Sequence, residues 1–314
     1  MKTILIGAVL GVAAISQLRP DPVASGLLET NTLFTIYGRG FDIAPVLGHL
    51  GTYKDIDAMA ADTRTWVTEI ASVNGGRGVV TGIHLIYGLA IPCNGAGNCL
   101  EYLNGDLVDK YIKPAAERGW TVILDTQIGR SDPTAEVKRM IDRGYLKYDN
   151  VHVAIDPEFH VVPGHDDPGI PIGTVAASQI NEVQEMLNRY VEAENLKTKK
   201  ILIVHQFGDA AVPDGVPFMI GDKGDLKDFA NVELAIDADG LGTPAEKVRK
   251  YNLMTNSRTY PSIRFSGLKV FFPNPWEHAG HFAKPPMTVD QVFGLAPVPG
   301  GLRMATKPNV LIIA

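Results

Sequence analysis

The stretch Val151-His-Val-Ala-Ile-Asp-Pro-Glu158 decides the fold class of this 314-residue chain. Its apolar residues form a short, nearly continuous run, which is typical of a strand that is covered on both faces. Side chains alternate along a strand with a period of two, so the valines and Ile155 face one way and Asp156 and Glu158 the other. The stretch therefore predicts a buried strand that ends in two carboxylic acids.

Similar runs recur along the chain and alternate with amphipathic stretches of helical spacing. The predicted strands are Leu33–Tyr37, Val79–Tyr87, Thr121–Asp125, Val151–Asp156, Lys200–His205, Val232–Asp237, Gly267–Phe272 and Val310–Ile313. The predicted helices are Asp55–Ala71, Leu103–Arg118, Pro133–Arg143, Val175–Asn195, Pro244–Thr255 and Val289–Phe293. The crossovers are long enough for parallel pairing. Eight such units predict the α/β class and a single-domain (β/α)8 barrel of the TIM type.

The barrel prediction has one rival and one missing part. A doubly wound open sheet would carry a G-x-G-x-x-G turn after its first strand, and Gly38-Arg39-Gly40-Phe41 lacks that spacing. No helical pattern follows Val310–Ile313, so the eighth helix is expected to be absent or replaced. Residues 19–30 are the candidate cover for that side of the barrel.

The charge balance excludes some classes of function. Lys and Arg number 29 against 35 Asp and Glu, a formal net charge of −6, so no broad basic surface for nucleic acid is expected. The chain has no Gly-x-Ser-x-Gly and no Gly-x-x-x-x-Gly-Lys-[Ser/Thr], which argues against serine hydrolases and nucleoside triphosphatases. No cofactor is predicted, and the oligomeric state stays open.

The N-terminus predicts export. Lys2 precedes an apolar run from Thr3 to Ile15 that is too short to span a bilayer, and Ala14-Ile15-Ser16 offers a small-residue cleavage site. Residues 1–20 are the predicted signal peptide and residues 21–314 the barrel domain. The mature chain is expected in the secreted, periplasmic or outer cell-envelope space, without a stable membrane span. Alternatively, the first residues open a βα unit of the fold.

The two cysteines predict a disulfide. Five small or turn-forming residues separate Cys93 from Cys99, which lets the chain curl back to bonding distance. Two cysteines alone make a poor zinc site. An exported chain would hold them oxidised, whereas two free loop thiols are the alternative.

Polar residues gather at the predicted C-terminal strand ends, where barrels of this type place their active sites. The predicted substrate-binding residues are Tyr37, Arg39, His84, Tyr87, Gln127, His205, Gln206, Asp239, Asn274, Trp276 and Glu277. The predicted catalytic residues are Glu158, Asp156, Asp125 and Asp237. By the period-two count these carboxylates point inward from three strands. Converging like charges shift one another's pKa, which indicates a functional site rather than packing.

Paired carboxyl groups at a barrel mouth suit cleavage of a glycosidic bond, so the expected partner is a carbohydrate or another small polar substrate. Glu158 is the predicted general acid. Asp156, held by a hydrogen bond from His84 or Gln127, is expected to stay ionised and to raise the pKa of Glu158. The alternative for Glu158 is a structural ion pair with Arg130 or Arg39.

Strand six offers two further carboxylates, Asp237 and Asp239. Gly240 and Gly242 are expected to let Asp239 turn toward a backbone amide, which leaves Asp237 to face the substrate. A single strand-end Asp can also be a helix cap, and Asp132 before Pro133 is predicted to be one.

The ending Asp156-Pro157-Glu158 resembles the Asp-x-Glu strand ending of chitinase-like glycosidases. The resemblance covers about nine residues, and it implies that Glu158 is the acid and that Asp156 orients a substrate acetamido group. Asn150 and Ala154 stand where that motif would have acids or glycine, and the later Met-x-Tyr-Asp pattern is absent. The wider chain resembles secreted bacterial barrels.

Two other function classes remain open. His84, His160, His205, Asp125 and Asp237 could form the site of a metal-dependent hydrolase, although neither a His-x-His pair on strand one nor a His-Glu-x-x-His motif occurs. A non-catalytic barrel could instead bind a glycan or a protein through a rim formed by 208–223 and 273–299.

Overall fold

The computed structural model describes residues 26–43, 48–93, 97–208, 219–239, 242–271 and 286–314. The predicted export signal lies outside the described residues. So do three predicted site residues, Asn274, Trp276 and Glu277, together with residues 209–218 and 273–285 of the two loops predicted to form a binding rim.

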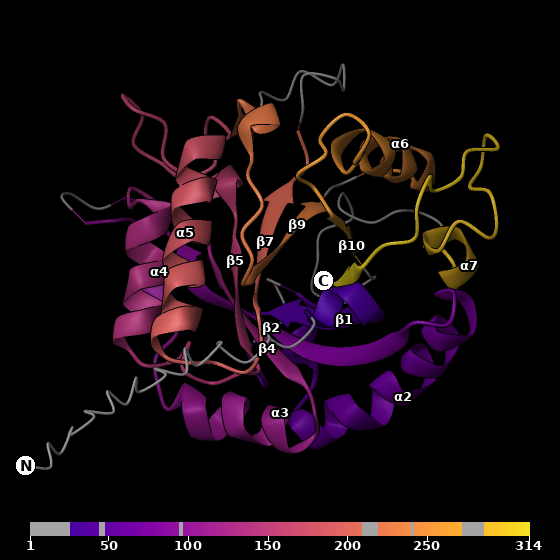
Figure 1. The fold of residues 1–314 in the computed structure, drawn as a ribbon, viewed down its shortest axis with the longest axis horizontal. Coiled ribbons are helices and arrows are strands. Elements are labelled where there is room, and N and C mark those ends of the chain that lie inside the picture. The colour runs from indigo at the N-terminus through magenta and orange to yellow at the C-terminus, as the bar shows by residue number, and fades with distance from the viewer. Residues whose placement is uncertain (1–25, 44–47, 94–96, 209–218, 240–241, 272–285) are drawn as a thin grey trace, which may run out of the picture.

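Eight parallel strands form a closed barrel at the centre of the molecule (Figure 1). In spatial order they are β1 (Asn31–Gly38), β2 (Gly78–Ala90), β4 (Thr121–Thr126), β5 (Val151–Ile155), β7 (Lys200–Gln206), β9 (Val232–Ala238), β10 (Phe265–Val270) and β11 (Val310–Ile313). The barrel closes because β1 pairs with β2 on one side and with β11 on the other. The closed parallel barrel confirms the predicted α/β class and excludes the open-sheet rival.

Three short strands lie outside the barrel. β3 (Leu100–Tyr102) extends the end of β2 as an antiparallel partner. β6 (Val175–Ala176) and β8 (Ile220–Gly221) form a separate two-stranded sheet. The sequence predicted helix from residue 175, but the pairing of β6 with β8 delays the helix to Ala177.

Helices lie between the strands and surround the barrel (Figure 1). They are α2 (Ile56–Val73), α3 (Lys113–Glu117), α4 (Pro133–Asp142), α5 (Ala177–Ala193), α6 (Pro244–Met254) and α7 (Val289–Val292). A π-helical turn, η3 (Val108–Ile112), precedes α3, and short 3-10 turns are η2 (His49–Thr52), η4 (Pro157–Phe159) and η5 (Lys223–Asp225). The predicted helix at 103–118 begins only at Val108, because Gly105 takes a positive φ of 103°. Asp132 caps α4 as predicted, since its carboxylate accepts from the Thr134 N–H.

Two apolar layers follow the alternation of the strands. Outward side chains such as Val153 and Leu202 pack with the helices in the larger core. Inward side chains such as Ile123, Ala154 and Ile203 fill the barrel. The predicted facing of β5 is therefore confirmed, and it places the strand-end carboxylates on the inner side.

The helix α1 (Leu27–Thr30) closes the N-terminal end of the barrel. Leu28 belongs to the inner apolar layer, and its N–H donates to both carboxylate oxygens of Glu233, at 3.0 and 3.1 Å. Asn309, just before β11, donates to the Leu28 carbonyl. The prediction that this segment covers the eighth side of the barrel is thus wrong for the described residues. Leu28 packs with the inward-facing side chains of the barrel and not with the helices of the outer wall.

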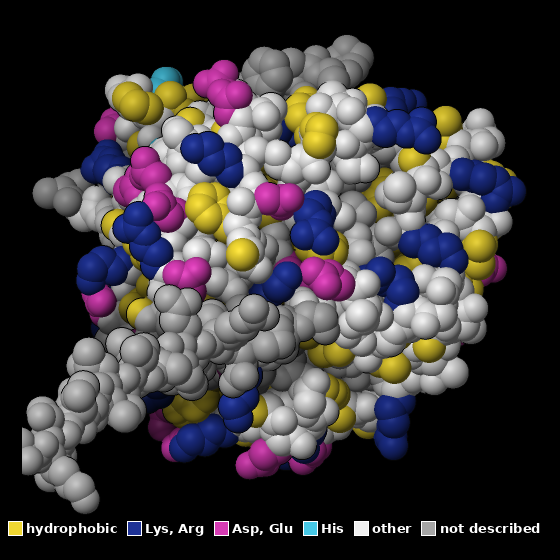
Figure 2. Space-filling view, in the orientation of Figure 1, with side chains coloured by type: hydrophobic (Ala, Val, Ile, Leu, Met, Phe, Trp, Pro, Cys, Tyr) yellow, Lys and Arg dark blue, Asp and Glu magenta, His cyan; other side chains and the backbone are white. Residues whose placement is uncertain are grey.

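Charges of both signs mix on the surface over α4 and α5 (Figure 2). Two pairs at helical i,i+4 spacing contribute there, Lys138 with Asp142 and Arg189 with Glu185. None of the described helices has both the length and the apolar character that crossing a bilayer requires.

Candidate active site

A buried polar layer lies inside the barrel at the C-terminal ends of its strands. Its members, each at most 6% exposed, are Tyr37, His84, Asp125, Asp156, His205, Asp237, Asp239 and Lys269. They come from seven of the eight barrel strands or from the residues that directly follow them. Strand ends predicted separately from the sequence thus meet in one place.

His205 lies at the centre of this polar layer. Its Nδ1 is 3.0 Å from Asp237 Oδ2, and its Nε2 is 3.3 Å from Asp125 Oδ2. His84 Nε2 lies 3.6 Å from the same Asp125 oxygen. Burial opposes the ionised form of Asp125, yet His205 and His84 lower the pKa of its carboxyl below its usual range. Burial lowers the pKa of His84 to about 4.

Lys269 is a member of the polar layer that the sequence analysis missed. Its Nζ lies 2.8 Å from Asp239 Oδ2 and 4.0 Å from the centroid of the Tyr37 ring. Burial opposes its charge, but Asp239 and Asp156 raise the pKa of the ammonium. The signal in the sequence was a charged residue, Lys269, inside an otherwise largely apolar run.

Glu158 lies at the outer edge of the polar layer and is partly exposed. Burial raises the pKa of its carboxyl to about 8, and the negative charges of Asp156 and Asp239 add to the shift. Neither arginine named as its alternative partner pairs with it in the described residues. Arg39 binds Glu101, and Arg130 binds Asp166.

Asp156 differs from its prediction. Its Oδ1 accepts from the Glu158 N–H at 3.2 Å, and within the described residues neither His84 nor Gln127 donates to it. Burial raises the pKa of Asp156 to about 7, with the charge of His205 opposing the shift and that of Asp125 adding to it. The expectation that Asp156 is the firmly ionised member of the pair is therefore wrong. Loss of hydration outweighs the one backbone hydrogen bond that Asp156 accepts.

The contacts of Asp237 and Asp239 differ from those predicted. Asp237 has no exposed surface and accepts from His205, whereas Asp239 binds Lys269 rather than a backbone amide. Burial opposes ionisation of Asp239, but Lys269 and His205 lower its pKa below the usual range. Asp239 is thus the carboxyl held ionised beside Glu158.

Four predicted substrate-binding residues are engaged elsewhere. Arg39 donates to the Ile86 and Tyr87 carbonyls, and the Tyr87 ring contacts Tyr102 and Tyr145 in the outer core. Gln127 Oε1 accepts from the Ala90 N–H, and Gln206 Oε1 accepts from Lys223. These four side chains brace the strand ends and do not join the polar layer.

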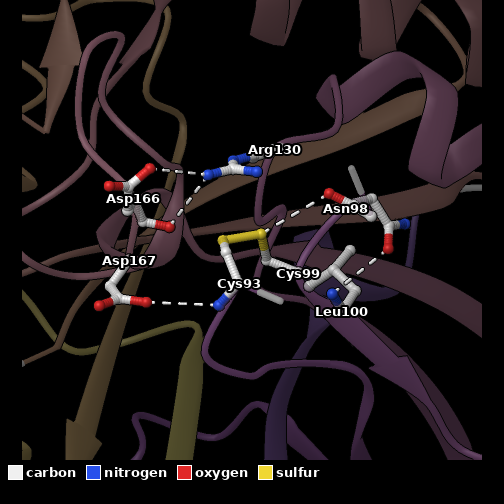
Figure 3. The surroundings of a disulfide bond; sticks show 8 residues. Cys93, Asn98, Cys99, Leu100, Arg130, Asp166 and Asp167 are labelled. Atoms are coloured by element: carbon white, nitrogen blue, oxygen red, sulfur yellow. Dashed lines mark hydrogen bonds and ion pairs between the residues drawn. A yellow bond between two sulfur atoms is a disulfide. The ribbon is translucent and has the colours of Figure 1, made fainter. Parts of the chain in front are cut away.

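The predicted disulfide between Cys93 and Cys99 is present (Figure 3). The Cys93 N–H donates to Asp167, and Arg130 pairs with Asp166 in the same loop. The bridge therefore lies where the loops after β2, β4 and β5 meet, on the side of the barrel that carries the polar layer.

No protein-family model matches the sequence, and comparison with curated proteins finds no match either.

Proposed function

We propose that the chain is a hydrolase of the glycosidase type, with Glu158 as its general acid. The observation that carries the proposal is that two carboxyl groups at one strand-end site have pKa values shifted in opposite directions. Glu158 stays protonated to about pH 8, whereas Lys269 favours the ionised form of Asp239. Environments that push two carboxyl pKa values apart are the usual arrangement for an acid and a base in one active site.

The chemistry follows from those two states. Glu158 would give its proton to the glycosidic oxygen as the bond breaks, and Asp239 would act as the base or stabilise the positive charge that develops on the sugar. His205 contacts both Asp125 and Asp237, and these contacts would help to hold the strand ends in place. The substrate class is a carbohydrate, reached at the mouth of a barrel that we take to be of the (β/α)8 TIM type.

The disulfide supports a location outside the reducing cytosol. Bridges of this kind persist in oxidising compartments. We therefore propose that the chain is exported, with residues 1–20 as its signal.

The test begins with release of reducing sugar from a panel of oligosaccharides by the full chain. On a substrate that is cleaved, Glu158→Gln should lower turnover by about 10²- to 10⁴-fold, because it keeps the shape and removes the proton. The loss should be much smaller on an aryl glycoside whose leaving group needs no proton. Glu182→Gln, at an exposed glutamate of α5, is the matched control and should change nothing.

Two outcomes contradict the proposal. One is near-normal turnover of an unactivated glycan by Glu158→Gln, which would place the acid elsewhere. The other is a panel from which the wild-type chain releases no sugar.

A further inference from the structure

Three fully buried side chains in the polar layer converge on one point. His84 Nε2 and His205 Nε2 lie 3.6 and 3.3 Å from the same atom, Asp125 Oδ2. Each of the three side chains is 0% exposed, and the three atoms all lie within 4.8 Å of one another. They come from β2, β4 and β7, so the barrel itself fixes their positions.

The converging atoms contact one another as ion pairs, but they make no hydrogen bond of ordinary geometry in the described part of the chain. This holds for both nitrogens of His84, both oxygens of Asp125 and Nε2 of His205. Buried polar atoms are almost always paired, because leaving them unpaired forfeits their hydration without replacement. One species bound at this point would satisfy the atoms that face it.

The separations fit a metal ion better than hydrogen bonds. A zinc ion holds histidine nitrogens and carboxylate oxygens at about 2.0–2.2 Å in a tetrahedron, which places neighbouring ligand atoms about 3.3–3.6 Å apart. The observed 3.3 and 3.6 Å match these edges. An N–H···O hydrogen bond is shorter, usually 2.7–3.2 Å.

The surroundings have the features of a metal centre. His205 Nδ1 donates to Asp237 Oδ2 at 3.0 Å, and a carboxylate bound to the far nitrogen is the usual support for a metal-binding histidine. Four carboxyl groups, those of Asp125, Asp156, Asp237 and Asp239, lie in the layer together with the ammonium of Lys269. This excess of carboxyl groups favours a bound cation.

A second set of side chains, His205, Asp237 and Asp239, also comes within metal-binding distance. In this second set His205 Nδ1 already bonds to Asp237 Oδ2, and Asp239 Oδ2 bonds to Lys269 Nζ at 2.8 Å, so only the other oxygen of each aspartate lacks a hydrogen-bond partner among the described residues. This second set is therefore the outer support of the first and not a separate site.

We propose that His84, Asp125 and His205 bind one divalent transition-metal ion through Nε2, Oδ2 and Nε2. Two imidazoles and one carboxylate leave the fourth position for water or substrate, as in catalytic zinc sites. The same donors also suit Fe²⁺, and metal analysis distinguishes the two. The proposal goes beyond the glycosidase assignment, because Glu158 is not a ligand.

The test uses the full, tag-free chain, stripped with a chelator and then titrated with Zn²⁺ by calorimetry. One equivalent should bind. Co²⁺ should give the intense visible absorption of a four-coordinate ion, and elemental analysis after exposure to Zn²⁺ and Fe²⁺ together should identify the preferred metal. A metal that binds only the folded chain should also raise its melting temperature.

Substitutions in and beside the site should weaken metal binding to different degrees. Asp237→Asn should weaken Zn²⁺ binding by about 10- to 100-fold, as expected for an outer support. His84→Gln and Asp125→Asn should weaken it further and abolish the Co²⁺ absorption. His165→Ala, at an exposed histidine, is the matched control and should bind as the wild type does.

The metal proposal is tested apart from the acid proposal. Glu158→Gln should bind Zn²⁺ normally even if it abolishes hydrolysis. A folded wild-type chain that binds no equivalent of Zn²⁺ or Fe²⁺ overturns the metal site, as does unchanged affinity in His84→Gln or, where that variant does not fold, in Asp125→Asn.

Discussion

Lys269 Nζ lies 2.8 Å from Asp239 Oδ2, and both side chains are buried inside the mouth of the barrel. The lysine comes from β10, and the aspartate directly follows β9, so the contact joins the ends of two neighbouring strands. A buried charge with a close partner of opposite sign keeps its ionised form. The pair therefore sets the charge state beside Glu158 as well as holding the strand ends together.

Breaking this pair on one side should destabilise the fold. Lys269→Met removes the closest partner of the buried Asp239, which keeps only the longer contact of 3.8 Å with His205, and should lower the free energy of unfolding by about 3 kcal/mol. Adding Asp239→Asn to that variant should recover much of the loss, because neither charge then remains. Urea unfolding of both variants measures the two effects.

An exposed ion pair serves as the control for the buried pair. Lys113 and Asp109 form an i,i+4 ion pair on the surface, so Lys113→Met should cause no measurable change. Equal effects of Lys269→Met and Lys113→Met would show that the buried contact adds nothing.

The period-two pattern predicted the position of most of the polar layer. Alternation along β5 predicts that Asp156 points inward, and Asp156 and His84 both lie in the layer. Along β2, His84 and Tyr87 are three residues apart, so alternation places them on opposite faces. Tyr87 lies in the outer core, and the prediction that it binds substrate is wrong because it did not apply this alternation. Lys269 was missed because it was included in an apolar run, although an inward lysine needs a buried partner.

The charge states could not be predicted, because they depend on burial and on contacts between distant strands. Asp156 and Asp239 each follow a strand in the same way, yet burial raises the pKa of the first and Lys269 lowers that of the second. Arg39 was expected in the site because of its charge. Its guanidinium instead binds carbonyls at the end of β2, which no local pattern reveals.

A glycine on β10 leaves room for the carboxylate that supports His205. A Cβ on Gly267 would come within 2.8 Å of Asp237 Oδ1 and 3.0 Å of its Cα. Gly267→Ala should therefore destabilise the chain by about 1–3 kcal/mol through overpacking. The urea midpoint measures the change.

Gly224→Ala is the matched control, because a Cβ there would meet no atom within 4 Å. Its effect should stay within about 0.5 kcal/mol. If the two alanine variants have the same midpoint, the space beside Asp237 is not tightly filled.

The disulfide should contribute modestly to stability. Cys93 and Cys99 are six residues apart, and closing so short a loop is worth about 2 kcal/mol in the loop-entropy model. The double variant Cys93→Ala/Cys99→Ala should lose that amount. A reducing agent should lower the melting temperature of the wild type and leave that of the variant unchanged, and a response in both would point to a different target.

The pH dependence of activity should show the protonated state of Glu158. Because its pKa is raised to about 8, the acid is available below that pH, and kcat/KM should fall as the pH rises through about 8. A profile that stays level from pH 7 to 10 on an unactivated glycan would contradict this role.

The raised pKa of Glu158 should also affect the pH dependence of stability, which can be measured without any substrate. In the unfolded chain Glu158 loses its proton near its ordinary pKa of 4.5, whereas the folded chain holds the proton to about pH 8. The folded state thus binds more protons between these values, so the contribution of Glu158 is full below about pH 4.5 and is lost as the pH rises through 8. Glu158→Gln, which cannot titrate, should gain stability relative to the wild type across that window.

Urea unfolding at several pH values measures the difference, with Glu182→Gln as the control that should run parallel to the wild type. A constant difference between Glu158→Gln and the wild type from pH 4.5 to 8 would mean that the folded state does not retain this proton.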